Sequence, residues 1–133
     1  MSEDNAATVR RGIEAWNRRD LKSFLAAHSP DVEFDWSRSR GPFQGVYGGR
    51  DGLEALWNEF YSTFTEVRIE AHGFTEAGPS DVVVPNTAHM RGRDGIEVTA
   101  RSAFVFTVKS GLIARLQMFQ DLPEALEAAG LSH

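Results

Sequence analysis

The chain begins with hydrophobic residues at helical spacing. Val9, Ile13 and Trp16 recur at intervals of four and three residues, which predicts one apolar helix face over residues 4–18. Asp20 then has the position and chemistry of an N-cap for a second, shorter helix. The apolar face of that second helix consists of Leu21, Phe24 and Leu25.

We expect Pro30 to end the second helix, after which the hydrophobic period becomes alternating. Val32, Phe34 and Trp36 alternate with acidic residues, as in a strand with one buried face. A polar, glycine-rich stretch follows over residues 37–52. The widest helical stripe of the sequence comes next and consists of Leu53, Leu56, Trp57, Phe60, Tyr61 and Phe64.

The second half of the chain has the pattern of strands joined by tight turns. Four segments alternate in hydrophobicity: residues 67–71, 82–91, 96–108 and 112–120. Asp94-Gly95 between two of them is a strong hairpin signal. A final short helix is predicted over residues 122–129, with Asp121 as its cap and Gly130 just beyond it. Successive hairpins favour an antiparallel sheet, and helices gathered on one side of it make the fold class α+β.

The two faces of the longest predicted strand differ in character. One face is nearly all apolar, and we expect it to lie against the helices; it consists of Ile96, Val98, Ala100, Ser102, Phe104, Phe106 and Val108. The other face mixes polar residues with Val105, and the last strand adds Ile113 and Phe119 to it. Such a face is too apolar for open solvent, so we expect it to form a homodimer interface.

Composition and charge narrow the classes of function. With 133 residues, 41% of them hydrophobic, we expect one domain over residues 1–133 with its own core. The absence of cysteine excludes disulfides and thiolate chemistry and favours a cytoplasmic location. A net charge of −5 argues against a nucleic-acid partner. No segment has the length and hydropathy of a membrane span or signal peptide, so we expect no membrane partner.

Four segments resemble the SnoaL-like branch of the NTF2-like proteins. They are EAWNRRDL at 14–21, PDVEF at 30–34, GVYGGRDG at 45–52 and EALEAAGL at 124–131. The resemblance implies a cone-shaped α+β fold, in which a curved antiparallel sheet packs on N-terminal helices and a short C-terminal helix follows. It also implies a pocket for a small apolar molecule. The family includes polyketide cyclases, isomerase-like and hydrolase-like enzymes, and proteins without an assigned activity.

The resemblance to ketosteroid isomerases tests one specific activity. Those enzymes use a tyrosine on the first helix, an aspartate base on the first strand and an acid on a later strand. The corresponding positions here are Gly12, Trp36, and Phe104 or its neighbour Ala103. None of these residues can transfer a proton, so we expect no isomerase activity of that kind. The catalytic sets of the cyclase and epoxide-hydrolase relatives cannot be assembled on one face either.

Large apolar side chains on converging faces predict a binding pocket. The expected substrate-binding residues are Trp16, Trp36, Trp57, Phe104, Leu116 and Met118, with Gln120 near the mouth and Tyr47 as a lid residue. Such a lining is typical of a site for a flat or cyclic apolar ligand. The alternative, that these side chains simply fill the core, stays open at this point.

Three polar residues are candidates for acid–base or anchoring roles. Asn86 shares a strand face with the two valines before it, whereas His89 has the opposite parity. Pro85 can introduce a bulge that exchanges the faces, so either Asn86 or His89 could reach the pocket. Asp35 is the third candidate, although its parity is opposite to that of Trp36.

No spacing of His or carboxylate residues indicates a metal site, and we expect no cofactor. We place His28 at the end of the second helix, where a cation favours the helix dipole.

Two classes of function remain. The first class is an enzyme acting by acid–base chemistry on an apolar cyclic or polyketide-like substrate. The second is a non-catalytic ligand-binding or dimerisation module with the same pocket.

Overall fold

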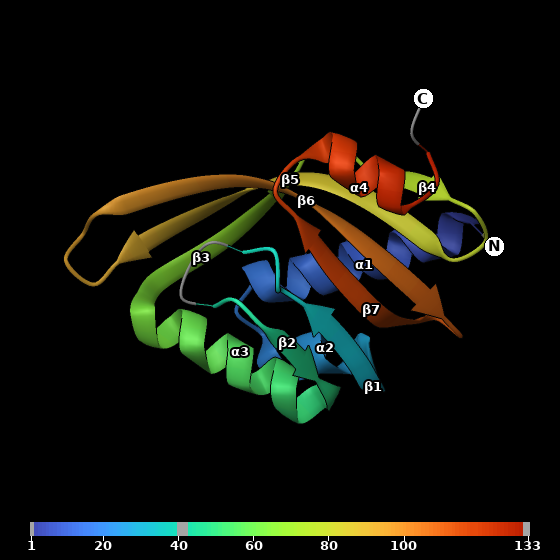
Figure 1. The fold of residues 1–133 in the computed structure, drawn as a ribbon. Coiled ribbons are helices and arrows are strands. Elements are labelled where there is room, and N and C mark those ends of the chain that lie inside the picture. The colour runs from blue at the N-terminus through green and yellow to red at the C-terminus, as the bar shows by residue number, and fades with distance from the viewer. Residues whose placement is uncertain (1, 40–42, 132–133) are drawn as a thin grey trace.

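The computed structural model describes residues 2–39 and 43–131. Its helices are α1 (Ser2–Asn17), α2 (Leu21–Ala26), α3 (Gly49–Thr63) and α4 (Leu122–Ala128). Its strands are β1 (His28–Asp35), β2 (Val46–Gly48), β3 (Phe64–Ala71), β4 (Thr75–Ala77), β5 (Asp81–Gly92), β6 (Glu97–Lys109) and β7 (Leu112–Phe119). The strands form one curved sheet in the order β2-β1-β7-β6-β5-β3, with β4 paired to β5 (Figure 1).

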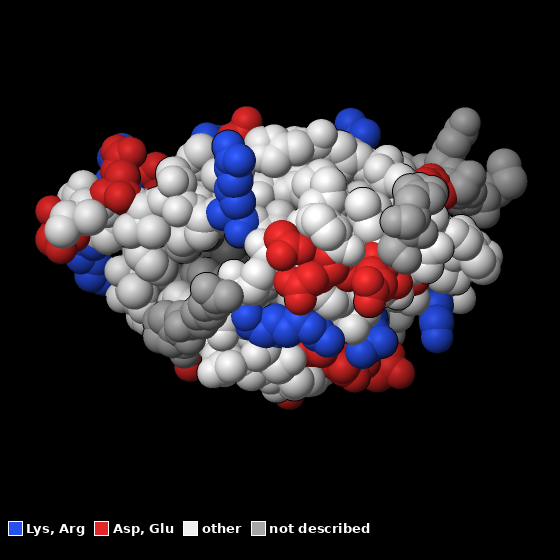
Figure 2. Space-filling model, turned by 45° about the horizontal axis from the view of Figure 1, so that its top comes forward, with Lys and Arg blue, Asp and Glu red and all other residues white. Residues whose placement is uncertain are grey.

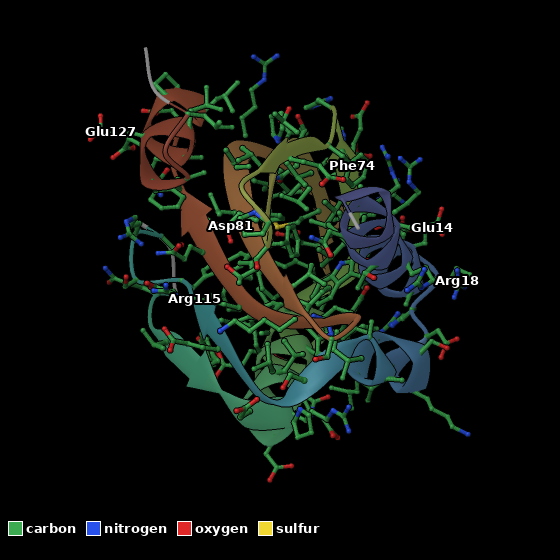
Figure 3. All side chains as sticks on the ribbon, turned by 90° about the vertical axis from the view of Figure 1, so that its right-hand side faces the viewer. Glu14, Arg18, Phe74, Asp81, Arg115 and Glu127 are labelled. Atoms are coloured by element: carbon green, nitrogen blue, oxygen red, sulfur yellow. The ribbon has the colours of Figure 1, made fainter. Side chains whose placement is uncertain are left out.

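The sheet is mixed rather than purely antiparallel. The hairpins pair antiparallel as predicted, but the neighbouring strands β1 and β7 run parallel. The helices also occupy both faces of the sheet. Figures 1 and 3 show α1 on one side and α4 on the other, with the labelled Glu14, Arg18 and Glu127 pointing away from the sheet. The prediction that all helices gather on one side was therefore wrong for α4, while the fold class α+β is confirmed.

Helix α3 carries the predicted apolar stripe into the core. The buried residues of α3 are Leu53, Leu56, Trp57, Phe60 and Tyr61. Helix α1 contributes Val9 and Trp16 to the same core. Apolar burial at this scale is the main favourable term of folding, so these two stripes fix how the helices pack on the sheet.

Helix α2 ends earlier than predicted. Asp20 does cap it, by accepting a hydrogen bond from the backbone N–H of Ser23, but its last residue is Ala26. Pro30 instead lies inside β1, between His28 and Glu33, where the pairing with β7 is irregular. A proline lacks the N–H that a regular ladder requires, so this break in the pairing accommodates it.

The outer face of the sheet differs from the predicted dimer interface. An irregularity between Thr107 and Val108 shifts the β6–β7 register, so Ile113 pairs with Val108 and turns to the inner face. Val105 and Phe119 do lie on the outer face, but both are buried in a second cluster that includes Ala125 of α4. The three residues that suggested a homodimer are therefore covered within one chain, and the dimer stays a prediction without their support.

Candidate functional site

A cavity of about 400 Å³ lies between the helices and the inner face of the sheet. Six of the predicted binding residues line it: Trp16, Trp36, Phe104, Leu116, Met118 and Gln120. They come from α1, β6 and β7 and from the positions just after β1 and β7, which are distant in sequence and converge because the sheet curves over the helices (Figure 1). Its size falls within the range of small-molecule sites in proteins.

Two predicted binding residues do not reach the cavity. Trp57 is buried beside it and packs its ring against Trp16 and Tyr61, with ring centroids 5.0 Å apart in each pair. Tyr47 is half-buried, and its hydroxyl donates a hydrogen bond of 2.9 Å to the carbonyl oxygen of Phe43. Trp57 therefore belongs to the core that supports the cavity. Tyr47 lies outside the cavity lining and is bonded to Phe43.

Trp16 anchors α1 to the edge strand of the sheet. Its indole Nε1–H donates a hydrogen bond of 3.1 Å to the carbonyl oxygen of Val67 on β3. The next residue, Asn17, bonds both backbone groups of Ile69: its amide donates to the carbonyl oxygen at 2.9 Å and accepts from the N–H at 2.8 Å. These bonds satisfy an exposed strand edge and hold the wall of the cavity at a fixed distance from α1.

Asn86 is the polar residue of β5 that faces the cavity. Its side chain is buried, donates a hydrogen bond of 3.1 Å to the carbonyl oxygen of Val84 and accepts one of 3.2 Å from the hydroxyl of Ser102. Pro85 does not exchange the faces, because β5 pairs with β6 without interruption. Pro85 falls between the segment paired with β4 and the segment paired with β3, where its missing N–H leaves no broken ladder bond.

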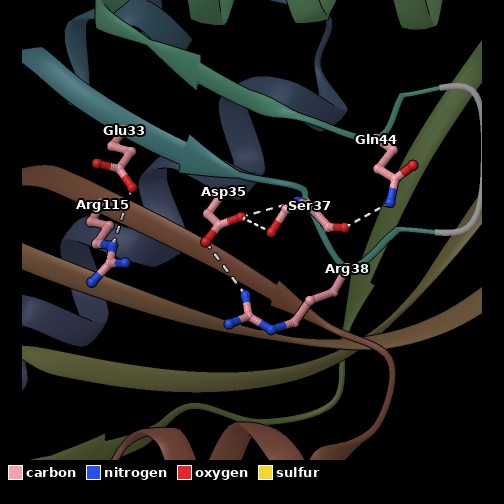
Figure 4. Close-up of polar contacts among 6 residues, drawn as sticks. All are labelled: Glu33, Asp35, Ser37, Arg38, Gln44 and Arg115. Carbon is pink, nitrogen blue, oxygen red and sulfur yellow. Dashed lines mark hydrogen bonds and ion pairs between the residues drawn. The ribbon is translucent and has the colours of Figure 1, made fainter.

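His89 and Asp35 lie on the outer face of the sheet, away from the cavity. The imidazole Nε2 of His89 lies 2.8 Å from a carboxylate oxygen of Glu70 on the neighbouring strand. Asp35 accepts hydrogen bonds from Ser37 and pairs with the guanidinium of Arg38 at 3.4 Å (Figure 4). Burial raises the pKa of the Asp35 carboxyl, but these partners outweigh it and the pKa is lowered overall. Neither residue can act on a molecule in the cavity.

His28 is a cavity residue, and the prediction that it ends the second helix was wrong. It begins β1, is 1% exposed, and its ring lies against Phe24 and Phe34 with centroid distances of 4.7 Å and 5.4 Å. Burial lowers its pKa from 6.5 to about 4, because a charged imidazolium is poorly solvated there. The residue is therefore neutral at pH 7 and not the helix-terminal cation that we expected.

The mouth of the cavity is shaped by the segment after β1. Trp36 is half-buried and stacks on Phe34 with an interplanar angle of 10°. Gln120 holds this segment to the end of β7, since its amide donates a hydrogen bond of 2.6 Å to the carbonyl oxygen of Arg38.

The face shown in Figure 2 is largely uncharged, with acidic and basic side chains interspersed and no broad basic area.

The positions that correspond to isomerase catalytic residues do face the cavity. Gly12, Trp36 and Phe104 all line it, whereas Ala103 lies in the outer cluster with Ala125 of α4. Of these two alternatives, Phe104 is therefore the one that faces the cavity. Within residues 2–39 and 43–131 the cavity lining contains no Asp, Glu or Tyr.

The described part of the chain holds no group of three or more potential metal ligands. None of its helices is long and apolar enough to cross a membrane.

Comparison with known proteins places this architecture in a class. A curved mixed sheet over N-terminal helices, with a cavity between them, is typical of the NTF2-like proteins. The solved structures that are similar to this chain include NTF2-like proteins. The profile of the SnoaL-like domain matches residues 9–116, and the chain therefore belongs to the SnoaL-like family of the NTF2-like superfamily. A comparison with curated proteins gave no match.

Three solved structures illustrate the similarity. An NTF2-like protein of unknown function from Burkholderia pseudomallei is 28% identical, with a TM-score of 0.77 over 93% of this chain and 95% of that one. TerC, co-crystallised with polyporic acid, is 20% identical, with a TM-score of 0.78 over 96% and 98%. RV0760c from Mycobacterium tuberculosis, in complex with estradiol-17beta-hemisuccinate, is 14% identical, with a TM-score of 0.78 over 90% and 95%. Identities of 20% and 14% indicate a shared fold alone.

Proposed function

We propose that this protein binds a small, largely apolar cyclic molecule in the cavity. The observation that carries the proposal is the cavity of about 400 Å³, whose walls are mainly aromatic and aliphatic side chains. Aromatic rings offer large rigid surfaces to a flat ligand at little cost in conformational entropy. Two neighbours of the same fold, TerC and RV0760c, were crystallised with polyporic acid and an estradiol derivative, which supports this class of ligand.

The geometry favours binding without acid–base catalysis. Proton transfer requires a titrating group within hydrogen-bond reach of the substrate. The described lining offers no carboxylate: besides His28, its polar side chains are those of Ser39, Asn86, Arg101, Ser102 and Gln120. An enzyme acting on a polyketide-like substrate would have to rely on His28 or on a group of the substrate itself. The non-catalytic ligand-binding module is therefore the function that we propose.

The test of the proposed function is binding of a neutral apolar probe. We expect 2-methoxynaphthalene to bind and to raise the melting temperature, as mass action requires for a ligand of the folded state. Trp36→Ala should weaken this binding about tenfold, because it removes the half-buried ring that stacks on Phe34. Isothermal titration calorimetry measures the affinity of both proteins.

Tyr47→Phe is the matched control for this experiment. Tyr47 lies outside the cavity lining, so its variant should bind the probe as the wild type does. A wild-type protein that shows neither heat of binding nor a thermal shift would refute the proposed function. An unchanged affinity in Trp36→Ala would assign that side chain to packing alone.

A second prediction is that the protein does not isomerise Δ5-3-ketosteroids. The reaction needs a carboxylate base and an acid that stabilises the dienolate, and a positioned base alone contributes about 10²- to 10⁴-fold in rate. Gly12, Trp36 and Phe104 line the cavity at the corresponding positions and supply neither group. Absorbance of the conjugated enone, followed with 5-androstene-3,17-dione, should stay at the rate of the uncatalysed control. Turnover that is abolished by Trp36→Ala would contradict this reading of the site.

A further inference from the structure

The ring of His28 is held in one tautomer and one orientation. Its Nδ1 lies 2.6 Å from the carbonyl oxygen of Phe24. A carbonyl oxygen only accepts hydrogen bonds, so Nδ1 carries the hydrogen and donates. Because burial lowers the pKa to about 4, the ring is neutral at pH 7, and Nε2 has a lone pair but no hydrogen. The second ring nitrogen is thereby an obligatory hydrogen-bond acceptor.

This acceptor has no partner within the protein. Nε2 of His28 is buried and makes no hydrogen bond to any residue that the structure describes. Buried polar atoms in native proteins are almost always paired, since leaving one unpaired costs free energy. A purely structural role, tying the end of α2 to the start of β1, is already fulfilled by Nδ1 and leaves Nε2 unexplained.

The ring of His28 is part of the cavity wall, although its Nε2 is covered by neighbouring atoms. His28 lines the cavity together with Gly12, Phe34 and Ile113. The Cε1 atom, which lies between the two ring nitrogens, is 3.9 Å from the position that a Cβ atom on Gly12 would take. That same position is only 2.9 Å from the Cδ1 atom of Ile113. Glycine at residue 12 thus keeps α1 close to the ring and leaves no side chain between the helix and His28.

We propose that a hydroxyl or N–H group of a ligand in the cavity displaces the atoms that cover Nε2 of His28 and donates a hydrogen bond to it. The inference rests on the proposed function and names its ligand class: a neutral ring compound that carries a donor group. A carbonyl, ether or carboxylate oxygen at the same place would face another acceptor and lose its own solvation without compensation. His28 thereby distinguishes ligands by whether this group donates a hydrogen bond, and not only by the size of the group.

Two probes that differ in one donor test the proposal. 2-Naphthol carries a hydroxyl, and 2-methoxynaphthalene replaces its hydrogen with a methyl group. At pH 7.5 the wild-type protein should bind 2-naphthol about fivefold more tightly, the effect of one hydrogen bond between neutral groups. His28→Asn keeps an N–H within reach of the Phe24 carbonyl but removes Nε2, so it should abolish the preference. His72→Asn makes the same substitution at an exposed residue and should retain it.

A nuclear magnetic resonance experiment reads the acceptor directly and needs no variant to fold. The ¹⁵N resonance of the unprotonated Nε2 of His28 should move on addition of 2-naphthol and stay in place on addition of 2-methoxynaphthalene. If both probes bind equally and the resonance does not move, the inference is wrong although the proposed function stands. If neither probe binds, both fail.

Discussion

Val105→Glu is expected to destabilise the folded protein strongly rather than to dissociate a dimer. Val105 is 2% exposed and packs with Ala103 and Phe119 beneath α4. A carboxylate at this position would be buried without a cationic partner, which costs about 4 kcal/mol or more of folding free energy. Total stabilities of domains this size are about 5–15 kcal/mol, so the loss takes a large share. Urea unfolding followed by circular dichroism measures it.

Thr99→Glu is the matched control for Val105→Glu. Thr99 lies on the same strand and the same face of the sheet but is exposed. Its substitution should change the unfolding free energy by no more than about 0.5 kcal/mol. A stable, monomeric Val105→Glu protein derived from a wild-type dimer would restore the interface interpretation and contradict the burial under α4.

The local patterns of the sequence were sufficient to predict most of the helices and hairpins. Helix α3 shows why: its apolar residues repeat at helical spacing, and all five that are buried belong to the predicted stripe. The β5–β6 hairpin was equally clear, because Asp94-Gly95 separates two alternating segments. These features depend on residues close together in sequence, where periodicity and turn chemistry carry the information.

Pairing between distant segments was not predictable in the same way. The parallel contact of β1 with β7 joins residues about eighty positions apart and has no local signal. Strands β2 and β4 have three residues each, which is too short for an alternating pattern to emerge. The irregularity between Thr107 and Val108 reverses the face of Ile113, because a strand's side chains exchange sides when one residue is added.

For the cavity residues, the alternation of side chains along a strand predicted the correct face where no distant part of the chain was involved. Asn86 faces the cavity by the parity that it shares with Val82 and Val84. The importance of His28 was missed because its burial depends on residues of distant elements, among them Gly12 of α1 and Ile113 of β7. One signal was available: Phe24 and His28 are four residues apart, the spacing at which side chains on one helical turn meet.

The stability of the protein should fall as the pH decreases from about 6.5 to about 4, in part because of His28. Burial lowers the pKa of its imidazole from 6.5 to about 4 in the folded state. Between these values the unfolded chain binds a proton at this residue and the folded protein does not. Protonation therefore favours unfolding, and the contribution of His28, fully present above pH 6.5, decreases by about 1.4 kcal/mol per pH unit. The total loss by pH 4 is about 3 kcal/mol.

Comparison of variants isolates this contribution from that of the carboxyl groups. Asp35 and Glu70 also have lowered pKa values, and they lose their stabilising effect as the pH falls through those values. His28→Asn cannot titrate at residue 28, so its unfolding free energy, measured in urea at each pH, should depend less steeply on pH from 6.5 to 4. Parallel curves for wild type and His28→Asn would show that the imidazole is accessible to protons in the folded state, and the ring would then not be the buried neutral acceptor that the cavity geometry requires.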